Sequence, residues 1–378
     1  MRARMIFAFV VLAFLAFAQG GALAMETTAR QAILLDATTG TVLLDKNADQ
    51  RMPTSSMSKM LTLYEVFQTL REGRLKLDTA LPVSERAWRL QGSKMFVELG
   101  GQVKVEDLIR GVAIQSGNDA CVVLAEGLAG SEESFAARMN QTAQKLGMTS
   151  SHFVNSTGWP DPQHFSTARD LAKLGVHLIK DFPDYYPLFA ETNFTYHGIN
   201  QGNRNPLLYR NMGVDGIKTG HTEDAGYGLT AAAKRGNRRL VLVVNGLSSM
   251  QARADESARL LEWGFHEFSV YALLRAGDQL DRARVWQGTD KDIPLTLGED
   301  VMLTLSRPQR ADMKAMIRFD EPVPAPITKG AKLGTLILTA PDMAPIERPL
   351  LAGADVPRLG LIDRMLGSLR HLILGENG

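Results

Sequence analysis

The chain has 378 residues, which is too long for one ordinary domain and fits two. Its hydrophobic content of 45% and charged content of 22% are those of a globular protein with a buried core. The net charge is +1 and no basic block is present, so the sequence predicts no nucleic-acid partner.

The first residues have the pattern of a targeting segment. A basic start precedes an apolar run at 5–18, and the small-residue pattern Ala-Leu-Ala ends at Ala24. These features predict a signal peptide over residues 1–24. The alternative, a membrane anchor, is disfavoured because the apolar run is short for a bilayer-spanning helix. We therefore expect a protein that works outside the cytoplasm.

The elements that follow predict an α+β domain over residues 25–276. Residues 29–47 hold two apolar stretches around a turn, which predicts a β-hairpin. Apolar residues then recur at three-four spacing in segments that predict helices at 58–70, 105–115, 119–129, 131–147 and 167–181. Strands are predicted at 214–222, 227–235 and 238–247, and an amphipathic helix at 250–268. A hairpin and three strands on either side of a helical insertion predict one antiparallel sheet with helices packed on it.

Beyond about residue 276 the pattern changes to short apolar strands punctuated by proline and glycine. The expected strands are 283–287, 293–297, 301–306, 313–319 and 335–340. Residues 277–357 therefore predict a small all-β domain. It contains no catalytic constellation, so we expect it to act as a spacer or a binding module.

The last segment, residues 358–378, predicts an amphipathic helix. Its apolar side chains, with the exception of Leu374, fall within an arc of about 140°, and they are Leu361, Ile362, Met365, Leu366, Leu369, Leu372 and Ile373. Such a helix either docks on its own protein or lies on a membrane surface. Because it follows a compact β domain with a proline and a glycine between them, we expect peripheral membrane contact through residues 360–374.

Three short motifs carry the predicted chemistry. Each occurs once: S-x-x-K at Ser56 and Lys59, S-x-N at Ser116 and Asn118, and K-T-G at residues 218–220. A lysine one helical turn from a serine can remove the hydroxyl proton if its charge is suppressed. An isolated S-x-x-K is more often a helix N-cap followed by a solvated lysine. The three motifs in this order, after a signal peptide, favour the chemical interpretation.

The motifs and their surroundings resemble the serine D-alanyl-D-alanine carboxypeptidases of the penicillin-binding protein 5 and 6 type, peptidase family S11. The stretches that carry the resemblance are PTSSMSKM, QSGNDACVVLAEGLAGSEESF, MGVDGIKTGHTEDAGYGL and LLEWGF, and it covers essentially the whole chain. The resemblance implies a β-lactamase/transpeptidase-like catalytic domain. It also implies that the protein trims peptidoglycan pentapeptide stems and is acylated by β-lactam antibiotics.

Acyl transfer needs a nucleophile, a base, a proton donor for the leaving nitrogen and a group that holds the substrate. The resemblance implies that Ser56 attacks the terminal D-Ala–D-Ala bond and that Lys59 takes its proton. A neutral amine near pH 7 requires a pKa far below the free value of about 10.4, and burial together with the charge of Lys218 would lower it. Ser116 is expected to pass a proton to the leaving nitrogen and Asn118 to hold the substrate amide. The alternative for this S-G-N stretch is a simple loop turn.

A carboxypeptidase substrate ends in a carboxylate, which needs hydrogen-bond donors and a cation. Thr219 offers a hydroxyl next to Gly220. Arg204 and Arg253 correspond by local sequence to arginines that the family places near that end, where a guanidinium can form two parallel hydrogen bonds. The alternative for both arginines is surface solubility. The resemblance also implies an oxyanion site made by the backbone N–H groups of the nucleophile and of His221.

The sequence departs from the family pattern at one position. In HFVNSTGWPD, Thr157 precedes Gly158, where family members usually carry a histidine. This departure concerns deacylation and substrate approach, whereas the acylation residues are all present.

Two other functions fit part of the sequence. A class A β-lactamase shares the fold, S-x-x-K and K-T-G, but no E-x-x-L-N stretch lies between Asn118 and Lys218, and such an enzyme needs no β domain or membrane helix. A non-catalytic β-lactam-binding or cell-wall-binding module would keep the pocket and lose turnover, yet no expected side chain is missing.

The remaining expectations concern cofactors, cysteine and location. The seven histidines show no H-E-x-x-H or comparable spacing, so neither a metal nor an organic cofactor is predicted. The single cysteine, Cys121, excludes an intramolecular disulfide and is expected to pack in a helix. The predicted location is the periplasm, with peripheral attachment to the inner membrane through the C-terminal helix.

Overall fold

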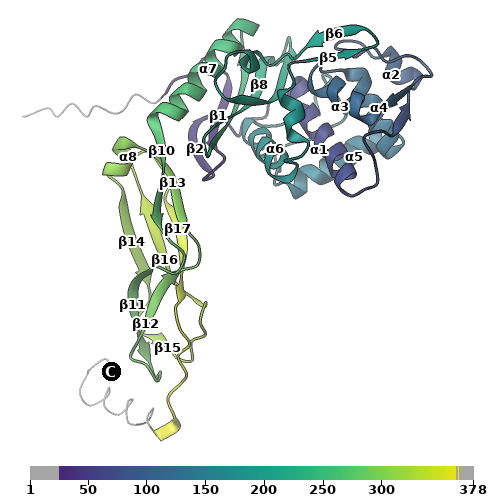
Figure 1. The fold of residues 1–378 in the computed structure, drawn as a ribbon. Helices are drawn as coiled ribbons and strands as arrows, with labels where there is room; N and C mark the ends of the chain where they lie inside the picture. The colour runs from purple at the N-terminus through teal and green to yellow at the C-terminus, as the bar shows by residue number, and fades with distance from the viewer. Residues whose placement is uncertain (1–24, 363–364, 366–378) are drawn as a thin grey trace, which may run out of the picture.

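The computed structural model describes residues 25–362 and Met365. A compact unit of helices and sheet is followed by an elongated β unit, which extends from the end of helix α7 (Figure 1). The predicted signal peptide and most of the predicted C-terminal helix lie outside the described residues. No helix within the described part is long and apolar enough to cross a membrane.

A five-stranded antiparallel sheet forms the centre of the first unit, in the order β2-β1-β9-β8-β7. Its strands are β1 (Gln31–Asp36), β2 (Thr41–Lys46), β7 (Val214–Thr222), β8 (Gly226–Arg235) and β9 (Arg238–Leu247). In the β1–β9 pair, Ile33 lies opposite Val243 and Leu34 opposite Leu242. Alternate side chains therefore point to opposite faces, and both faces are apolar and covered. The predicted sheet, assembled from both ends of the segment, is confirmed.

The helical insertion joins β2 to β7. Its helices and 3-10 turns are η1 (Ser55–Ser58), α1 (Lys59–Arg71), α2 (Glu85–Arg89), α3 (Val105–Ala113), α4 (Asn118–Ala129), α5 (Glu132–Lys145), α6 (Ala168–Asp181), η2 (Tyr186–Ala190) and η3 (Pro206–Tyr209). Two short strand pairs accompany them: β3 (Ala80–Pro82) with β4 (Gln102–Lys104), and β5 (Asn193–Tyr196) with β6 (Ile199–Gly202). The five predicted helices are confirmed, whereas α2 and the short strands and turns were not predicted.

Helix α1 runs through the middle of this insertion and is buried along almost its whole length. Met60, Leu63 and Phe67 are completely inaccessible, and Cys121 on α4 packs in the same core, as predicted. A residue at the start of α1 therefore enters a dry environment even when it is polar, as Lys59 shows.

Helix α7 (Met250–Glu267) covers the other face of the sheet. Its N-cap Ser249 accepts a hydrogen bond from the N–H of Ala252 at 3.0 Å. Leu260 and Leu261 are fully buried in a cluster with apolar residues of β1, β8 and β9. The sheet thus lies between α7 and the insertion, which gives the predicted α+β layout.

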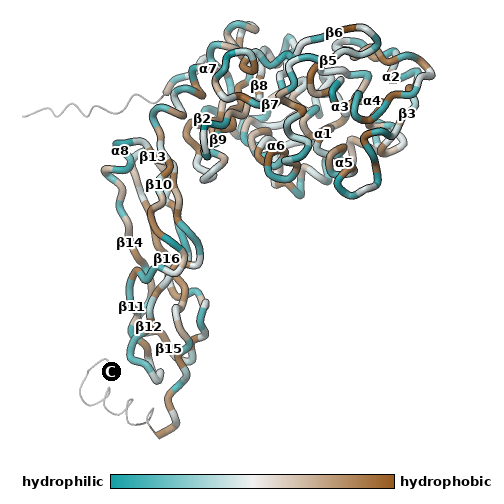
Figure 2. The backbone as a smooth tube through the Cα atoms, viewed as in Figure 1, coloured by the Kyte–Doolittle hydropathy of each residue, from teal (hydrophilic) through white to brown (hydrophobic). Residues whose placement is uncertain are grey.

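The second unit is all-β apart from one short helix, α8 (Arg307–Ala311). Its strands are β10 (Phe268–Leu274), β11 (Gln279–Trp286), β12 (Asp292–Leu297), β13 (Val301–Ser306), β14 (Lys314–Phe319), β15 (Val323–Pro324), β16 (Lys332–Thr339) and β17 (Ile346–Ala352). These strands carry hydrophobic stretches between more hydrophilic turns (Figure 2) and bury a core of their own. The five predicted strands are present, and β10, β15 and β17 are additional.

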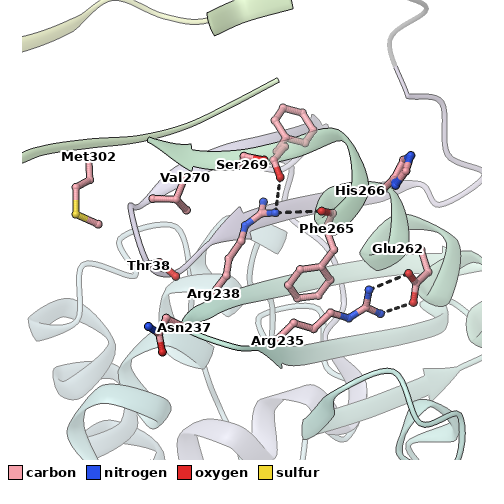
Figure 3. A pocket seen from close by; sticks show the side chains of 11 residues that line it. Thr38, Arg235, Asn237, Arg238, Glu262, Phe265, His266, Ser269, Val270 and Met302 are labelled. Carbon is pink, nitrogen blue, oxygen red and sulfur yellow. Dashed lines mark hydrogen bonds and ion pairs between the residues drawn. The ribbon is translucent and has the colours of Figure 1, made fainter. Parts of the chain in front are cut away.

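Strand β10 lies before the boundary expected at residue 276, but it pairs with β13 of the second unit. A buried polar cluster joins the two units at this point. The Asp36 carboxylate accepts from Arg238 Nε at 2.7 Å and from Thr304 Oγ1 at 3.0 Å. Arg238 also donates to the carbonyl oxygens of Phe265 and Phe268 (Figure 3). These bonds fix the start of β10 against the central sheet.

Candidate active site

The three motifs, far apart in the sequence, meet at one cavity of about 460 Å³. Seven of the ten predicted site residues line it: Ser56, Ser116, Arg204, Thr219, Gly220, His221 and Arg253. The other three, Lys59, Asn118 and Lys218, are buried at its base. Ser93, Tyr227 and Met250 also line the cavity and were not predicted from the sequence.

Lys59 lies at the centre of this arrangement and is completely buried. Its Nζ is 2.9 Å from Ser56 Oγ, 2.7 Å from Asn118 Oδ1 and 2.7 Å from the carbonyl oxygen of Thr157. No carboxylate forms an ion pair with it anywhere in the described part of the chain. Burial is the main cause that lowers the pKa of Lys59 to about 8, and the nearby Arg204 charge lowers it further.

The contacts of Lys59 suit a neutral amine. An NH2 group has two N–H donors, and Asn118 Oδ1 and the Thr157 carbonyl are two acceptors at short distance. The nitrogen lone pair is then left for the third neighbour, the hydroxyl of Ser56. The arrangement can therefore accept the Ser56 proton during nucleophilic attack.

Ser116 and Asn118 lie where the chain turns into helix α4. Ser116 adopts a left-handed backbone with φ of 60°, and its buried Oγ has no hydrogen-bond partner among the described residues. The Asn118 amide donates to the carbonyl of Gln91 at 2.8 Å, which fixes its orientation.

The next residue, Asp119, accepts from the N–H groups of Met95, Phe96, Val97 and Ala120 and so holds the loop beside the cavity. Its position after S-G-N was visible in the sequence, but its partners more than 20 residues away were not.

Strand β7 brings the K-T-G motif to the cavity. Lys218 is buried, and burial together with the charges of Lys59 and Arg204 lowers its pKa well below the ordinary value. Lys218 was expected to be the cation that, together with burial, lowers the pKa of Lys59, and the two buried amines do repel each other, since the charge of Lys59 is among the causes that lower the pKa of Lys218. Further along the strand, a Cβ on Gly220 would lie 2.8 Å from the carbonyl oxygen of Thr54. The absence of a side chain there lets β7 approach the turn that carries the nucleophile.

The two predicted arginines are cations without carboxylate partners within the described residues. Arg253 is only 6% exposed, its Nε has no hydrogen-bond partner, and burial lowers its pKa. Its guanidinium lies 5.7 Å from the ring centre of Tyr227, which in turn stacks on His221 at 3.9 Å. Arg204 donates to Ser93 Oγ at the other side of the cavity. Two partly dehydrated guanidinium groups that have no counter-ion within the described residues are suited to binding an anion.

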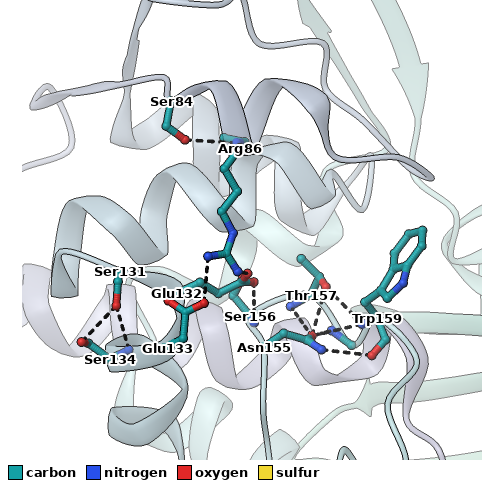
Figure 4. Close-up of polar contacts among 12 residues, drawn as sticks. Ser84, Arg86, Ser131, Glu132, Glu133, Ser134, Asn155, Ser156, Thr157 and Trp159 are labelled. Carbon is teal, nitrogen blue, oxygen red and sulfur yellow. Dashed lines mark hydrogen bonds and ion pairs between the residues drawn. The ribbon is translucent and has the colours of Figure 1, made fainter.

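The loop after α5 brings the Thr157 carbonyl to Lys59. Asn155 Oδ1 accepts from the N–H groups of Thr157, Gly158 and Trp159 at 2.8–3.1 Å and from the Thr157 hydroxyl (Figure 4). Glu132 anchors the same loop through Ser156 and pairs with Arg86. Because the Thr157 side chain is turned toward Asn155, its backbone carbonyl is the group that meets Lys59.

Gly158 is expected to be essential for this geometry. It adopts φ of 79°, and a Cβ there would lie 1.8 Å from the carbonyl oxygen of Ser55. Gly158→Ala should lower the free energy of unfolding by about 3–5 kcal/mol and slow acylation by fluorescent penicillin. Urea unfolding and labelling measure both effects.

Gly147→Ala is the matched control for this variant. Gly147 has φ of 72° but open space around its Cβ position, so the cost should be about 1 kcal/mol with normal labelling. Equal unfolding costs in the two variants would contradict the role assigned to close packing at Gly158.

An antiparallel sheet with a helical insertion and a serine in contact with a buried lysine defines the transpeptidase-like class of serine enzymes. A family model described as D-alanyl-D-alanine carboxypeptidase, peptidase family S11, matches residues 18–249, and one described as penicillin-binding protein 5, C-terminal domain, matches residues 268–358. The chain belongs to this D-alanyl-D-alanine carboxypeptidase family, which confirms the resemblance seen in the sequence.

Individual relatives match most or all of the described chain, and some match the first unit alone. D-alanyl-D-alanine carboxypeptidase DacC of Escherichia coli is 41% identical and the alignment covers 90% of this chain and 88% of that protein. The crystal structure of penicillin-binding protein 5 from Haemophilus influenzae has a TM-score of 0.80 at 36% identity, covering 89% of this chain and all of the other. Penicillin-binding protein D2 from Listeria monocytogenes, in an ampicillin-bound form, has a TM-score of 0.59 at 30% identity over 64% of this chain and 98% of that one.

Proposed function

We propose that the protein is a serine D-Ala-D-Ala carboxypeptidase that removes the terminal D-alanine from peptidoglycan pentapeptide stems. The observation that carries the proposal is the buried Lys59 amine, 2.9 Å from the Ser56 hydroxyl, beside a cavity lined by two arginines that have no carboxylate partner among the described residues. Ser56 Oγ attacks the carbonyl carbon of the last peptide bond as its proton passes to Lys59. The bond to the leaving nitrogen breaks, D-alanine departs, and water hydrolyses the acyl-enzyme.

The other residues assist these steps. Ser116, whose buried hydroxyl has no partner among the described residues, delivers a proton to the leaving nitrogen, and Asn118 holds the substrate amide. The backbone N–H groups of Ser56 and His221 stabilise the oxyanion. Lys218 acts on Lys59 as the neighbouring buried amine, and Thr219 donates to the substrate carboxylate.

The substrate carboxylate lies against Arg204 and Arg253. Replacing Arg253 with leucine should lower kcat/KM for a peptide ending in free D-Ala–D-Ala by about 10- to 100-fold, because a hydrogen-bonded charge contributes about 1.5–3 kcal/mol. A peptide with an amidated C-terminus should respond much less. Arg310→Leu, which also removes an arginine over a tyrosine ring but in the β unit, is the control. An equal loss for both peptides would contradict carboxylate recognition.

Release of D-alanine from a D-Ala–D-Ala pentapeptide, with penicillin as competitor, tests the function directly. We expect release that penicillin blocks through a long-lived covalent adduct. A class A β-lactamase would hydrolyse the adduct rapidly, and a non-catalytic binding module would release no D-alanine. Either result would replace the proposed function.

We also propose that the protein acts in the periplasm, attached peripherally to the inner membrane through residues 360–374. The support is the sequence pattern of both ends of the chain, which lie largely outside the described residues. A chain ending at residue 357 should no longer sediment with anionic phospholipid vesicles but should still hydrolyse soluble peptide. Sedimentation of the truncated chain would refute this anchor.

A further inference from the structure

The turn that carries the proposed nucleophile is bridged by a hydrogen bond between its two ends. Thr54 precedes the 3-10 turn η1 and Ser58 closes it, with Ser56 between them. The side-chain oxygens of Thr54 and Ser58 are hydrogen-bonded to each other. Both side chains are buried, and neither lines the proposed catalytic cavity. This bond therefore acts on the nucleophile through the turn that it closes.

Ser58 is the residue at which helix α1 begins, but its side chain does not cap that helix. A serine at this position ordinarily accepts a hydrogen bond from a backbone N–H of the first helical turn. Here that bond is not formed. The Ser58 hydroxyl instead lies 2.7 Å from Nε2 of His164, a residue 106 positions further along the chain. A favourable local bond is thus replaced by one to a distant loop, which indicates a requirement other than helix stability.

The partners of the His164 ring define its tautomer. Its Nδ1 accepts from the N–H of Val154 at 3.3 Å, so the ring proton lies on Nε2 and is donated to Ser58 Oγ. Burial lowers the pKa of His164 to about 4, so the ring is neutral over the pH range in which Lys59 titrates. A charged ring would place a second N–H against that of Val154. The neutral ring is therefore a fixed donor, and the Ser58 hydroxyl remains available to Thr54.

The turn needs such support because its backbone is not relaxed. Ser55 adopts φ of 49°, a left-handed conformation that is uncommon for residues other than glycine. Conformations of this kind persist only where the surrounding structure holds them. The loop that carries His164 makes two other contacts here, since Gly158 packs against the Ser55 carbonyl and the Thr157 carbonyl accepts from Lys59. One loop thus contacts both the turn of the nucleophile and the base beside it.

We propose that His164 is a positioning residue for acylation. Through the side-chain oxygens at the two ends of the turn, it holds Ser56 at hydrogen-bond distance from the Lys59 amine. The His164 ring does not line the catalytic cavity, so it acts on geometry and takes no part in proton transfer. This role rests on the proposed function, because it assumes that Ser56 is the acylated residue. Loss of the ring should slow the chemical step and leave the preceding binding of the β-lactam unchanged.

Acylation by fluorescent penicillin, followed at increasing penicillin concentration, separates the rate constant of the chemical step from the dissociation constant of the initial complex. His164→Leu should lower that rate constant by about 10- to 100-fold, the effect of a misplacement of about 1 Å, and leave the dissociation constant unchanged. His164→Gln, whose amide N–H can replace that of Nε2, should recover most of the rate. The rise of the rate with pH should persist in both variants, because Lys59 keeps its own partners.

Two further substitutions test whether the effect passes through Ser58. His152→Leu is the matched control, because its ring also lies against an aromatic ring, that of Phe165, and bonds the Gln163 carbonyl, but no hydrogen bond joins it to the turn within the described residues. Its acylation rate should equal that of the wild type. Ser58→Ala should slow acylation as His164→Leu does. The double variant should be no slower than the slower single variant, because both substitutions remove the same contact.

An acylation rate constant that is normal in His164→Leu, or equally low in the leucine and glutamine variants, would overturn the positioning role. A double variant in which the two single losses multiply would also overturn it. If urea unfolding shows that His164→Leu does not fold, Ser58→Ala still tests the role, and a normal rate constant there would refute it. A wild-type protein that penicillin does not acylate would instead overturn the proposed function.

Discussion

Replacing Ser56 with alanine should abolish covalent labelling by fluorescent penicillin and reduce D-alanine release by at least about 10⁴-fold. The hydroxyl lost is the one 2.9 Å from the Lys59 amine, and no other group in the cavity has such a base beside it. The fold should remain, because Ser56 lies in a 3-10 turn at the cavity surface and its side chain fills no core position.

Ser131→Ala is a useful control for the Ser56 variant. Ser131 caps helix α5 by accepting from the N–H of Ser134 at 3.1 Å, so its loss should cost about 1 kcal/mol of stability and leave labelling intact. The two variants thus separate chemistry from folding. Labelling that persists in Ser56→Ala would place the nucleophile elsewhere, with Ser116 as one of the other hydroxyls that line the same cavity.

Replacing Lys59 with methionine should slow acylation by about 10³-fold, which is the contribution expected of a positioned general base. Methionine has a similar length and suits the apolar core around α1. The substitution leaves Asn118 Oδ1 and the Thr157 carbonyl without their donor, which lowers the free energy of unfolding. It also removes the cost of burying an amine, which offsets part of that loss. We therefore expect a folded protein that penicillin acylates slowly. Acylation near the wild-type rate would show that another group is the base.

The pH dependence of acylation provides a second test of Lys59. Its pKa is lowered to about 8, so about one tenth of the amine is neutral at pH 7 and most of it is neutral at pH 9. Because the neutral form is the base, the acylation rate of the wild type should rise with pH and level off above about pH 8. The residual rate of Lys59→Met should lack this rise, and a wild-type rate that fell over the same range would contradict the assignment.

Local patterns predicted much of the fold because the spacing of apolar residues along a segment follows the period of the helix or strand that buries them. The strand predicted at 214–222 is found as β7 with the same limits, and the helix predicted at 167–181 is found as α6 within one residue. Elements with weak periodicity were missed. Strand β17 contains a proline and alternates only partly, and β10 continues directly from α7 without a turn signal.

The sequence by itself determined the family, the sheet assembled from both ends of the first unit, and the identity of the three motifs, because residue type and order are sufficient for these. Only the tertiary structure decided that Lys59 is fully buried, that Gly158 packs against the Ser55 carbonyl and that Arg253 is a cation without a counter-ion. Each of these depends on contacts between segments that are distant in the sequence, such as Lys59 with Thr157 and Gly158 with Ser55, or on the solvent removed by such contacts. Such contacts set burial, pKa and close packing, and no local sequence pattern encodes them.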